Sequence, residues 1–177
     1  MFSSFEYGFY YYYFLLHIPI TVCIDSSVVL PIEWYPKALQ QLINWHVASN
    51  NDFLLADKPL WLVVFVVVEL LVQLPLFVYF SVQLPRLQKA KEEVATGTHG
   101  DDKVSKVTLH ELRTRVTWWL KLYGVNASFT TLVCILAIFF NGHMIANVQW
   151  TMNLEDKLAL VGVYLPTFLI PLRLCFV

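Results

Sequence analysis

Hydrophobic residues gather into four long runs, and each run is about as long as a bilayer is thick. The runs cover about residues 7–24, 60–84, 117–140 and 157–177. A helix needs about 20 predominantly apolar residues to cross the hydrocarbon core. The pattern therefore predicts an all-α membrane protein, a four-transmembrane-helix bundle that forms a single domain over residues 1–177.

The stretch between the first and second runs is more polar but keeps a helical period. Pro36 suits the first turn of a helix. The residues that then recur at helical spacing are Leu39, Leu42, Ile43 and His46. We expect a short amphipathic helix that lies at the membrane surface or folds back as a lid. Asp52 follows it, either as the N-cap of the next helix or as a carboxylate over a cavity mouth.

The segment 86–116 carries much of the charge and predicts a polar, solvated loop. Eight of the twelve Lys and Arg residues lie between Arg86 and Lys121. Loops rich in Lys and Arg usually face the cytoplasm. With four spans, this places both chain termini on the cytoplasmic side as well.

Composition agrees with a membrane protein and narrows the chemistry. The chain is 58% hydrophobic and 14% charged, whereas soluble domains are about 45–50% apolar and about 25% charged. A net charge of -1 gives no reason to expect a nucleic-acid partner. The three cysteines, Cys23, Cys134 and Cys175, fall in apolar segments. We therefore expect no disulfide framework, no metal site and no cofactor.

The second run contains two polar residues at membrane depth, Glu69 and Gln73. They are four residues apart and so share one face of a helix. An ionisable group inside the membrane is costly and rarely faces lipid. It must meet another helix, a water-filled cavity or a ligand. The alternative is a hydrogen bond between helices that only holds the bundle together.

The end of the first run contains polar residues that could contact Glu69. His17, Thr21 and Asp25 follow one another at intervals of four and form one helical stripe. Taken singly, His17 could be a core histidine and Asp25 a helix-end residue at the headgroup level. Together, a base, a hydroxyl and an acid are hard to explain as packing against lipid.

The third and fourth runs each add one feature. Small residues, Gly124 and Ala127 among them, mark tight helix packing in the third run, which makes a homodimer plausible. Tyr164 in the fourth run is either a packed aromatic or a site residue. Its neighbour Pro166 frees a backbone carbonyl, which allows a site role.

Three stretches of this pattern resemble the sigma-2 receptor family, whose members carry the EXPERA domain. They are Leu16-His-Ile-Pro-Ile-Thr21 followed by Asp25, Val68-Glu-Leu-Leu-Val-Gln-Leu-Pro75, and Leu160-Val-Gly-Val-Tyr-Leu-Pro166. The resemblance covers nearly the whole chain. The exception is the segment 87–114, which looks longer and more polar than in the animal receptors.

The resemblance implies a four-helix protein of the endoplasmic reticulum membrane whose bundle encloses a cavity for sterols and hydrophobic amines. The key acids of the family match Asp25 and Asp52, and its intramembrane acid and amide match Glu69 and Gln73. Its cavity tyrosine matches Tyr164, and a threonine of its third helix matches Thr131. Fungal relatives are associated with efficient mitochondrial protein targeting, and animal ones with cholesterol handling.

Three functions are compatible with these residues. The first is binding of a sterol or cationic amphiphile within the bilayer. The expected ligand-binding residues are His17, Thr21, Asp25, Asp52, Glu69, Gln73, Thr131 and Tyr164. Another possibility is an adaptor or chaperone that recognises other proteins through the polar segment.

The second possibility is an enzyme, a sterol delta-8,delta-7 isomerase, because the EXPERA domain also occurs in those enzymes. They have a histidine four residues before the equivalent of Glu69, and here that position is Phe65. A double-bond shift needs one group to protonate the alkene and another to remove a proton. We therefore expect a protein without this activity, unless His17 or Asp25 replaces the missing group.

Overall fold

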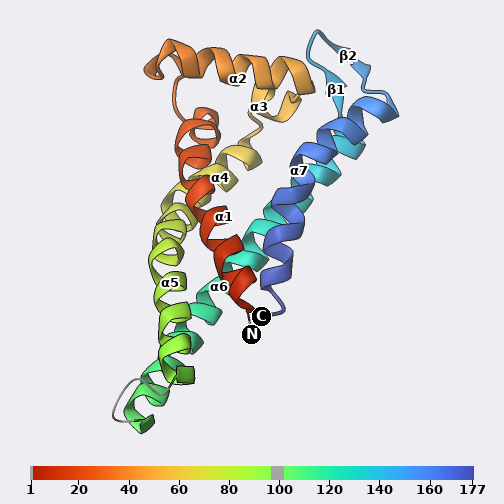
Figure 1. The fold of residues 1–177 in the computed structure, drawn as a ribbon. Coiled ribbons are helices and arrows are strands. Elements are labelled where there is room, and N and C mark those ends of the chain that lie inside the picture. The colour runs from red at the N-terminus through yellow and green to blue at the C-terminus, as the bar shows by residue number, and fades with distance from the viewer. Residues whose placement is uncertain (1, 97–101) are drawn as a thin grey trace.

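The computed structural model describes residues 2–96 and 102–177, and it describes side chains for 2–96 and 107–177. Nearly all of these residues are helical (Figure 1). The long helices are α1 (Ser4–Cys23), α2 (Lys37–Asn50), α5 (Leu74–Thr96), α6 (Asp102–Asn141) and α7 (Leu154–Leu174). The shorter elements are η1 (Asp25–Val28), η2 (Ile32–Trp34), α3 (Phe53–Asp57), α4 (Leu60–Val68) and η3 (Glu69–Gln73).

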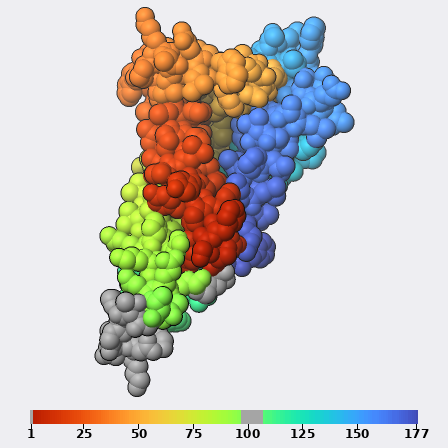
Figure 2. All heavy atoms as spheres, viewed as in Figure 1, coloured from red at the N-terminus to blue at the C-terminus, as the bar shows by residue number. Residues whose placement is uncertain are grey.

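The long helices form a bundle with both termini at one end. α5 packs against α1 and α6, and α6 packs against α7. The first and last helices meet beside the termini, where Arg173 Nη2 lies 3.2 Å from Glu6 Oε1 (Figure 1). α2 and α3 lie across the opposite end (Figure 2). α2 begins directly after Pro36, as the sequence predicts. Its role as a lid stays a prediction.

Within the described residues, three helical stretches are long and apolar enough to cross a membrane: Leu60–Thr96, Val107–Asn141 and Leu154–Leu174. Their outer faces expose large apolar side chains such as Leu71, Phe129 and Phe140. Extended apolar surface of this kind marks contact with lipid or a partner. These features support an all-α membrane protein.

The fourth predicted span, α1, is not one of these three stretches. Its 20 residues reach about 30 Å, the thickness of the hydrocarbon core. Its run of tyrosines, residues 10–13, makes it less apolar than the Val- and Leu-rich helices. Tyr10 and Tyr13 point into the bundle and are buried. The four-span count therefore stays a prediction.

Side-chain caps fix where several helices begin and end. Ser3 and Glu6 form a capping box at the start of α1, with Ser3 N donating to Glu6 Oε2 at 2.7 Å. Asn153 caps α7 by accepting from Asp156 N at 2.8 Å. Asn51 ends α2 in the left-handed region, at φ 49°, which Asn tolerates better than most residues.

The prediction of a polar loop over 86–116 is wrong wherever the structure describes this segment. α5 continues through Pro85 to Thr96, and α6 begins at Asp102. Residues 97–101 lie outside the described part. The charged residues here also favour helix, and pairs four apart support it, Gln88 with Glu92 at 3.0 Å and Lys89 with Glu93 at 3.8 Å. Hydropathy indicates where a span leaves the membrane, not where its helix ends.

The second span is continuous, but its helical geometry changes from α to π near its centre. The helix runs on through Pro75, and a π-helical turn, η3, immediately precedes this proline. In η3 the Leu74 N–H donates to the Glu69 carbonyl, five residues back. Proline lacks the N–H that would bond the Leu71 carbonyl, and its ring clashes with that carbonyl. A π turn relieves such a clash, and π turns are frequent at functional sites.

The small residues of α6 are explained by packing within the chain. A Cβ on Gly124 would lie 2.7 Å from the Pro171 carbonyl oxygen of α7. Ser128 Oγ donates to the Phe168 carbonyl at 3.4 Å. These contacts account for the residues from which a homodimer was expected, so they no longer argue for one.

The segment between α6 and α7 folds into a small hairpin that the sequence did not predict. β1 (His143–Met144) pairs antiparallel with β2 (Asn147–Thr151), with His143 opposite Thr151. The hairpin is the exception to an otherwise all-α fold among the described residues.

The buried apolar residues form two clusters at different heights in the bundle. The cluster nearer the termini joins α1, α5 and α6 around Phe14, Phe77 and Phe80. The other joins α3, α4, α6 and α7 around Leu54 and Leu160. A polar cavity lies where these two clusters meet.

Candidate functional site

The cavity has a volume of about 160 Å³ and is lined from α1, η1, α3, the second span, α6 and α7. Phe77 and Tyr123 of the cluster nearer the termini form part of its wall, and Leu62 and Val66 of the other cluster form another part. Of the eight ligand-binding residues predicted from the sequence, six line it. They are His17, Asp25, Glu69, Gln73, Thr131 and Tyr164. The other two, Thr21 and Asp52, lie directly behind lining residues.

Thr21 connects the stripe of the first helix to Glu69. Its side chain is fully buried, and its Oγ1 donates to Glu69 Oε1 at 2.8 Å. Asp25, in η1, lies beside Thr21 and Glu69 and interacts with both. Two carboxyl groups from different elements therefore meet near one buried hydroxyl in the cavity wall.

Ionisation of both carboxyl groups, Asp25 and Glu69, at the same time is unfavourable. Burial, and next to it the charge of Glu69, raise the pKa of Asp25 well above its usual range. Two acids that hydrogen-bond to each other need one proton between them, because ionised carboxylates are acceptors only. Their closeness and burial therefore favour a shared proton over ionisation of both acids.

Asp52 forms a separate buried contact on the α3 side. It is fully buried and caps α3, with Leu55 N donating to Oδ1 at 3.2 Å. Tyr164 OH donates to Oδ2 at 3.0 Å, and His46 Nε2 lies 3.6 Å from the same oxygen. The N-cap interpretation is confirmed. The carboxyl group beside Asp25 is that of Glu69, whereas Asp52 bonds to Tyr164.

Two lining side chains are free to meet a ligand. Gln73 is buried, and Thr131 is half-buried. Neither side chain makes a hydrogen bond to another residue in the described part of the chain. They offer an amide and a hydroxyl to whatever fills the cavity. A buried polar group without a protein partner is unfavourable unless water or a ligand satisfies it.

The orientation of His17 is fixed from its own helix. Its Nδ1 lies 2.9 Å from the Tyr13 carbonyl oxygen, which can only accept. Nδ1 therefore carries the proton, and a neutral His17 has its free lone pair on Nε2.

Several lining residues were missed by the sequence reasoning. The Tyr13 and Tyr123 hydroxyls lie 3.1 Å apart, and both residues line the cavity. Tyr13 lies four residues before His17, so the stripe of the first helix could have been extended to it. The other additions to the wall are Thr130, Cys134 and Thr167.

Phe65 occupies the position that separates this chain from the isomerases. It lines the cavity one helical turn before Glu69, and its ring packs against Trp61 with centroids 5.6 Å apart. An apolar ring therefore stands where an acid–base partner for Glu69 would be.

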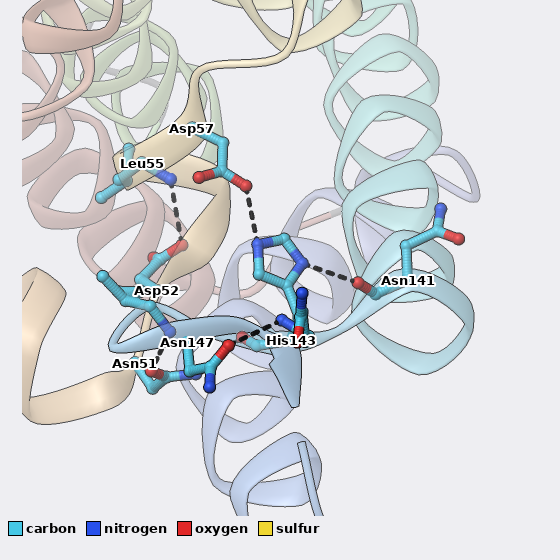
Figure 3. A network of polar contacts seen from close by, with 9 residues as sticks. Asn51, Asp52, Leu55, Asp57, Asn141, His143 and Asn147 are labelled. Atoms are coloured by element: carbon cyan, nitrogen blue, oxygen red, sulfur yellow. Dashed lines mark hydrogen bonds and ion pairs between the residues drawn. The ribbon is translucent and has the colours of Figure 1, made fainter. Parts of the chain in front are cut away.

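A second polar network lies beside the hairpin and holds the end of the bundle together (Figure 3). His143 Nε2 lies 2.9 Å from Asp57 Oδ2, and its Nδ1 lies 3.1 Å from the Asn141 carbonyl. Asn51 donates to the His143 carbonyl at 3.0 Å and accepts from Ile145 N at 2.9 Å. None of these residues lines the cavity, so we assign this network to the fold.

The chain is similar to known proteins over most of its length. The model of a family described as EXPERA (EXPanded EBP superfamily) matches residues 38–177. The chain is 46% identical to "Efficient mitochondria targeting-associated protein 19" of Saccharomyces cerevisiae, covering 97% of this chain and 96% of that protein. It is 33% identical to human "Sigma intracellular receptor 2", covering 90% and 78%. The same receptor of Xenopus tropicalis is 27% identical over 93% and 82%.

Proposed function

The chain belongs to the EXPERA family, and from that premise we propose that it binds sterols or hydrophobic amines in its polar cavity. The observation that carries the proposal is the Asp25–Glu69 pair, with the unpartnered Gln73 amide in the same wall. Ionisable groups within a membrane are expensive and usually functional. We place the protein in the endoplasmic reticulum membrane, with a role in sterol or lipid homeostasis or trafficking.

An amine would be recognised by a change in the charge of the acid pair. Without a ligand, Asp25 and Glu69 hold one proton between them. A protonated amine supplies a positive charge, which makes loss of that proton favourable. Thr21 keeps Glu69 in place during this exchange through its 2.8 Å hydrogen bond.

A neutral sterol would use other groups of the same wall. Its hydroxyl can pair with Gln73 or Glu69, and its rings can lie against Phe65 and Val66. Pockets for ligands of this size usually measure about 300–1,000 Å³, whereas the cavity measures about 160 Å³. A bound sterol therefore has to widen the cavity or leave part of its length in the bilayer.

The test for a resident lipid is mass spectrometry of the lipids that co-purify with the protein. The proposal expects a sterol bound to the wild type and depleted in Glu69→Ala. The matched control is Glu33→Ala, which removes an exposed acid in η2. Equal sterol content in all three proteins would contradict the proposal.

The test for amine recognition is the affinity of a cationic amphiphile for purified Asp25→Asn. This variant keeps the size of the side chain but cannot supply the negative charge. We expect amine affinity to fall at least tenfold and sterol affinity to change much less. Unchanged amine affinity would remove Asp25 from the site.

An isomerase remains the second candidate because His17 lines the same cavity as Glu69. Its Nε2 lone pair could accept the proton that the sterol loses, in place of the histidine absent at Phe65. Incubating the protein with a delta-8 sterol tests this. Product formed by the wild type and lost in both Glu69→Gln and His17→Gln would favour the enzyme.

A role in protein targeting is the third candidate, and the name of the yeast relative favours it. In this case the polar ends of α5 and α6 would bind another protein. Deletion of residues 91–106 would then abolish function in cells while leaving ligand affinity intact. Loss of both together would point to misfolding instead.

A further inference from the structure

A second hollow, of about 410 Å³, is lined by residues next to both termini, Phe2 and Val177 among them. It shares no lining residue with the polar cavity. Phe2, Leu87 and Trp118 give it apolar walls, and Arg113 and Lys121 of α6 line it as well. We call it the basic hollow.

Among the described residues, the two cations of the basic hollow have no counter-ion. Neither Arg113 nor Lys121 makes an ion pair or side-chain hydrogen bond in the described part of the chain. They are eight residues apart on α6, which separates their backbones by about 12 Å. No Asp or Glu side chain is among the described residues that line the hollow. Its charge is therefore suited to an anion.

Tyr7 adds a hydrogen-bond donor to this wall. The residue is only 3% exposed, and its hydroxyl has no hydrogen-bond partner among the described residues. Lys91 Nζ lies 5.7 Å from the centre of its ring, and Arg113 acts electrostatically on its hydroxyl. A phenol O–H that feels the Arg113 charge and has no partner among the described residues is available to donate to an anionic oxygen.

The basic hollow also lies at the expected depth of lipid headgroups. Arg113 precedes the third apolar run, which begins near residue 117, and Lys121 lies just inside it. Trp118, between them, is 59% exposed, and tryptophan is enriched at membrane–water interfaces. An occupant must combine an anionic head with an apolar body.

We propose that the basic hollow binds an anionic phospholipid. Its phosphate pairs with Arg113 and Lys121 and accepts from the Tyr7 hydroxyl. An acyl chain lies along Leu87 and Trp118. A free inorganic anion would use the cations but gain nothing from these apolar walls, so the lipid is the occupant that fits both.

Native mass spectrometry of the full chain in detergent, titrated with phosphatidylserine or phosphatidylcholine, tests this. We expect phosphatidylserine to bind at least tenfold more tightly than phosphatidylcholine. The double variant R113Q/K121Q should lose that preference, and Tyr7→Phe should weaken phosphatidylserine binding about threefold. No preference in the wild type would overturn the proposal.

The matched control is Arg115→Gln, which removes a charge from the same helix outside the basic hollow. It should keep the preference, and an equal loss would show diffuse electrostatic attraction instead. Competition by inorganic phosphate at the lipid's own concentration would assign the hollow to a soluble anion and overturn the proposal. Unchanged melting temperatures in the variants show that a loss of binding is local.

Discussion

At the scale of single residues, the spacing of polar positions was the most informative signal. Intervals of four predicted the stripe of His17, Thr21 and Asp25, and the structure brings this stripe to Glu69. Which carboxyl groups meet could not be predicted, because that depends on where η1 turns back against α4. The Tyr13–Tyr123 contact was missed because the polar stripe of the first run was not extended back to Tyr13.

The Asp25–Glu69 pair makes a prediction about pH. Asp25 has a raised pKa in the folded protein, so the folded state holds its proton to higher pH than the unfolded chain. Its contribution to stability is therefore present at low pH and lost as pH rises towards the raised pKa. Thermal melts in detergent between pH 4 and 8 should show stability falling with pH, and Asp25→Asn should flatten this slope. An identical slope in both proteins would mean that another group titrates.

At the scale of elements, helix existence was predictable and helix continuity was not. Apolar runs located the second, third and fourth spans. The extension of α5 to Thr96 was missed because charge was taken as a sign of a loop. The π turn η3 was missed because sequence periodicity assumes one helical geometry throughout a run.

The π turn links Pro75 to the candidate site. Replacing Pro75 by Ala restores the missing N–H and lets the helix return to α geometry, which turns Glu69 by about 100° relative to α5. We expect Pro75→Ala to keep the protein folded but weaken amine binding at least tenfold, measured on purified protein. Pro85→Ala, in the same helix and outside the cavity, should bind like the wild type.

The close packing of α6 on α7 gives a prediction that compares two glycine variants. Gly124→Ala places a Cβ against the Pro171 carbonyl, and such overpacking costs about 1–3 kcal/mol. Gly162→Ala meets nothing within 4 Å and should stabilise α7 by up to about 1 kcal/mol through helix propensity. Chemical unfolding in detergent measures both. Equal effects of the two changes would mean that Gly124 is not needed for the helix contact.

At the scale of the whole molecule, hydropathy predicted a membrane protein, and the structure adds how the ends of the bundle differ. The end with the termini carries the basic hollow, and the other carries α2, α3 and the hairpin. The number of spans decides whether the two chain termini face the same compartment. Three spans would place the termini on opposite sides, and four would place them together.

Cysteine labelling separates these topologies. Single cysteines at Glu92 and Asn147, both exposed, are introduced where the native cysteines have been replaced. With four spans, a membrane-impermeant maleimide applied to sealed microsomes should label Glu92→Cys and an N-terminal cysteine. It should reach Asn147→Cys only after permeabilisation. Protection of the N-terminal cysteine would exclude α1 as a span.

Asn51 has a consequence for how a ligand reaches the polar cavity. Its side-chain amide bonds to the backbone of His143 in β1 and of Ile145 in the turn that follows, while its own backbone ends α2. The Asn51 side chain thus connects α2 to the hairpin. We therefore expect α2 and the hairpin to move together. A ligand arriving from water would have to dislodge both at once. We therefore expect ligands to enter the polar cavity laterally from the lipid bilayer, between helices of the bundle.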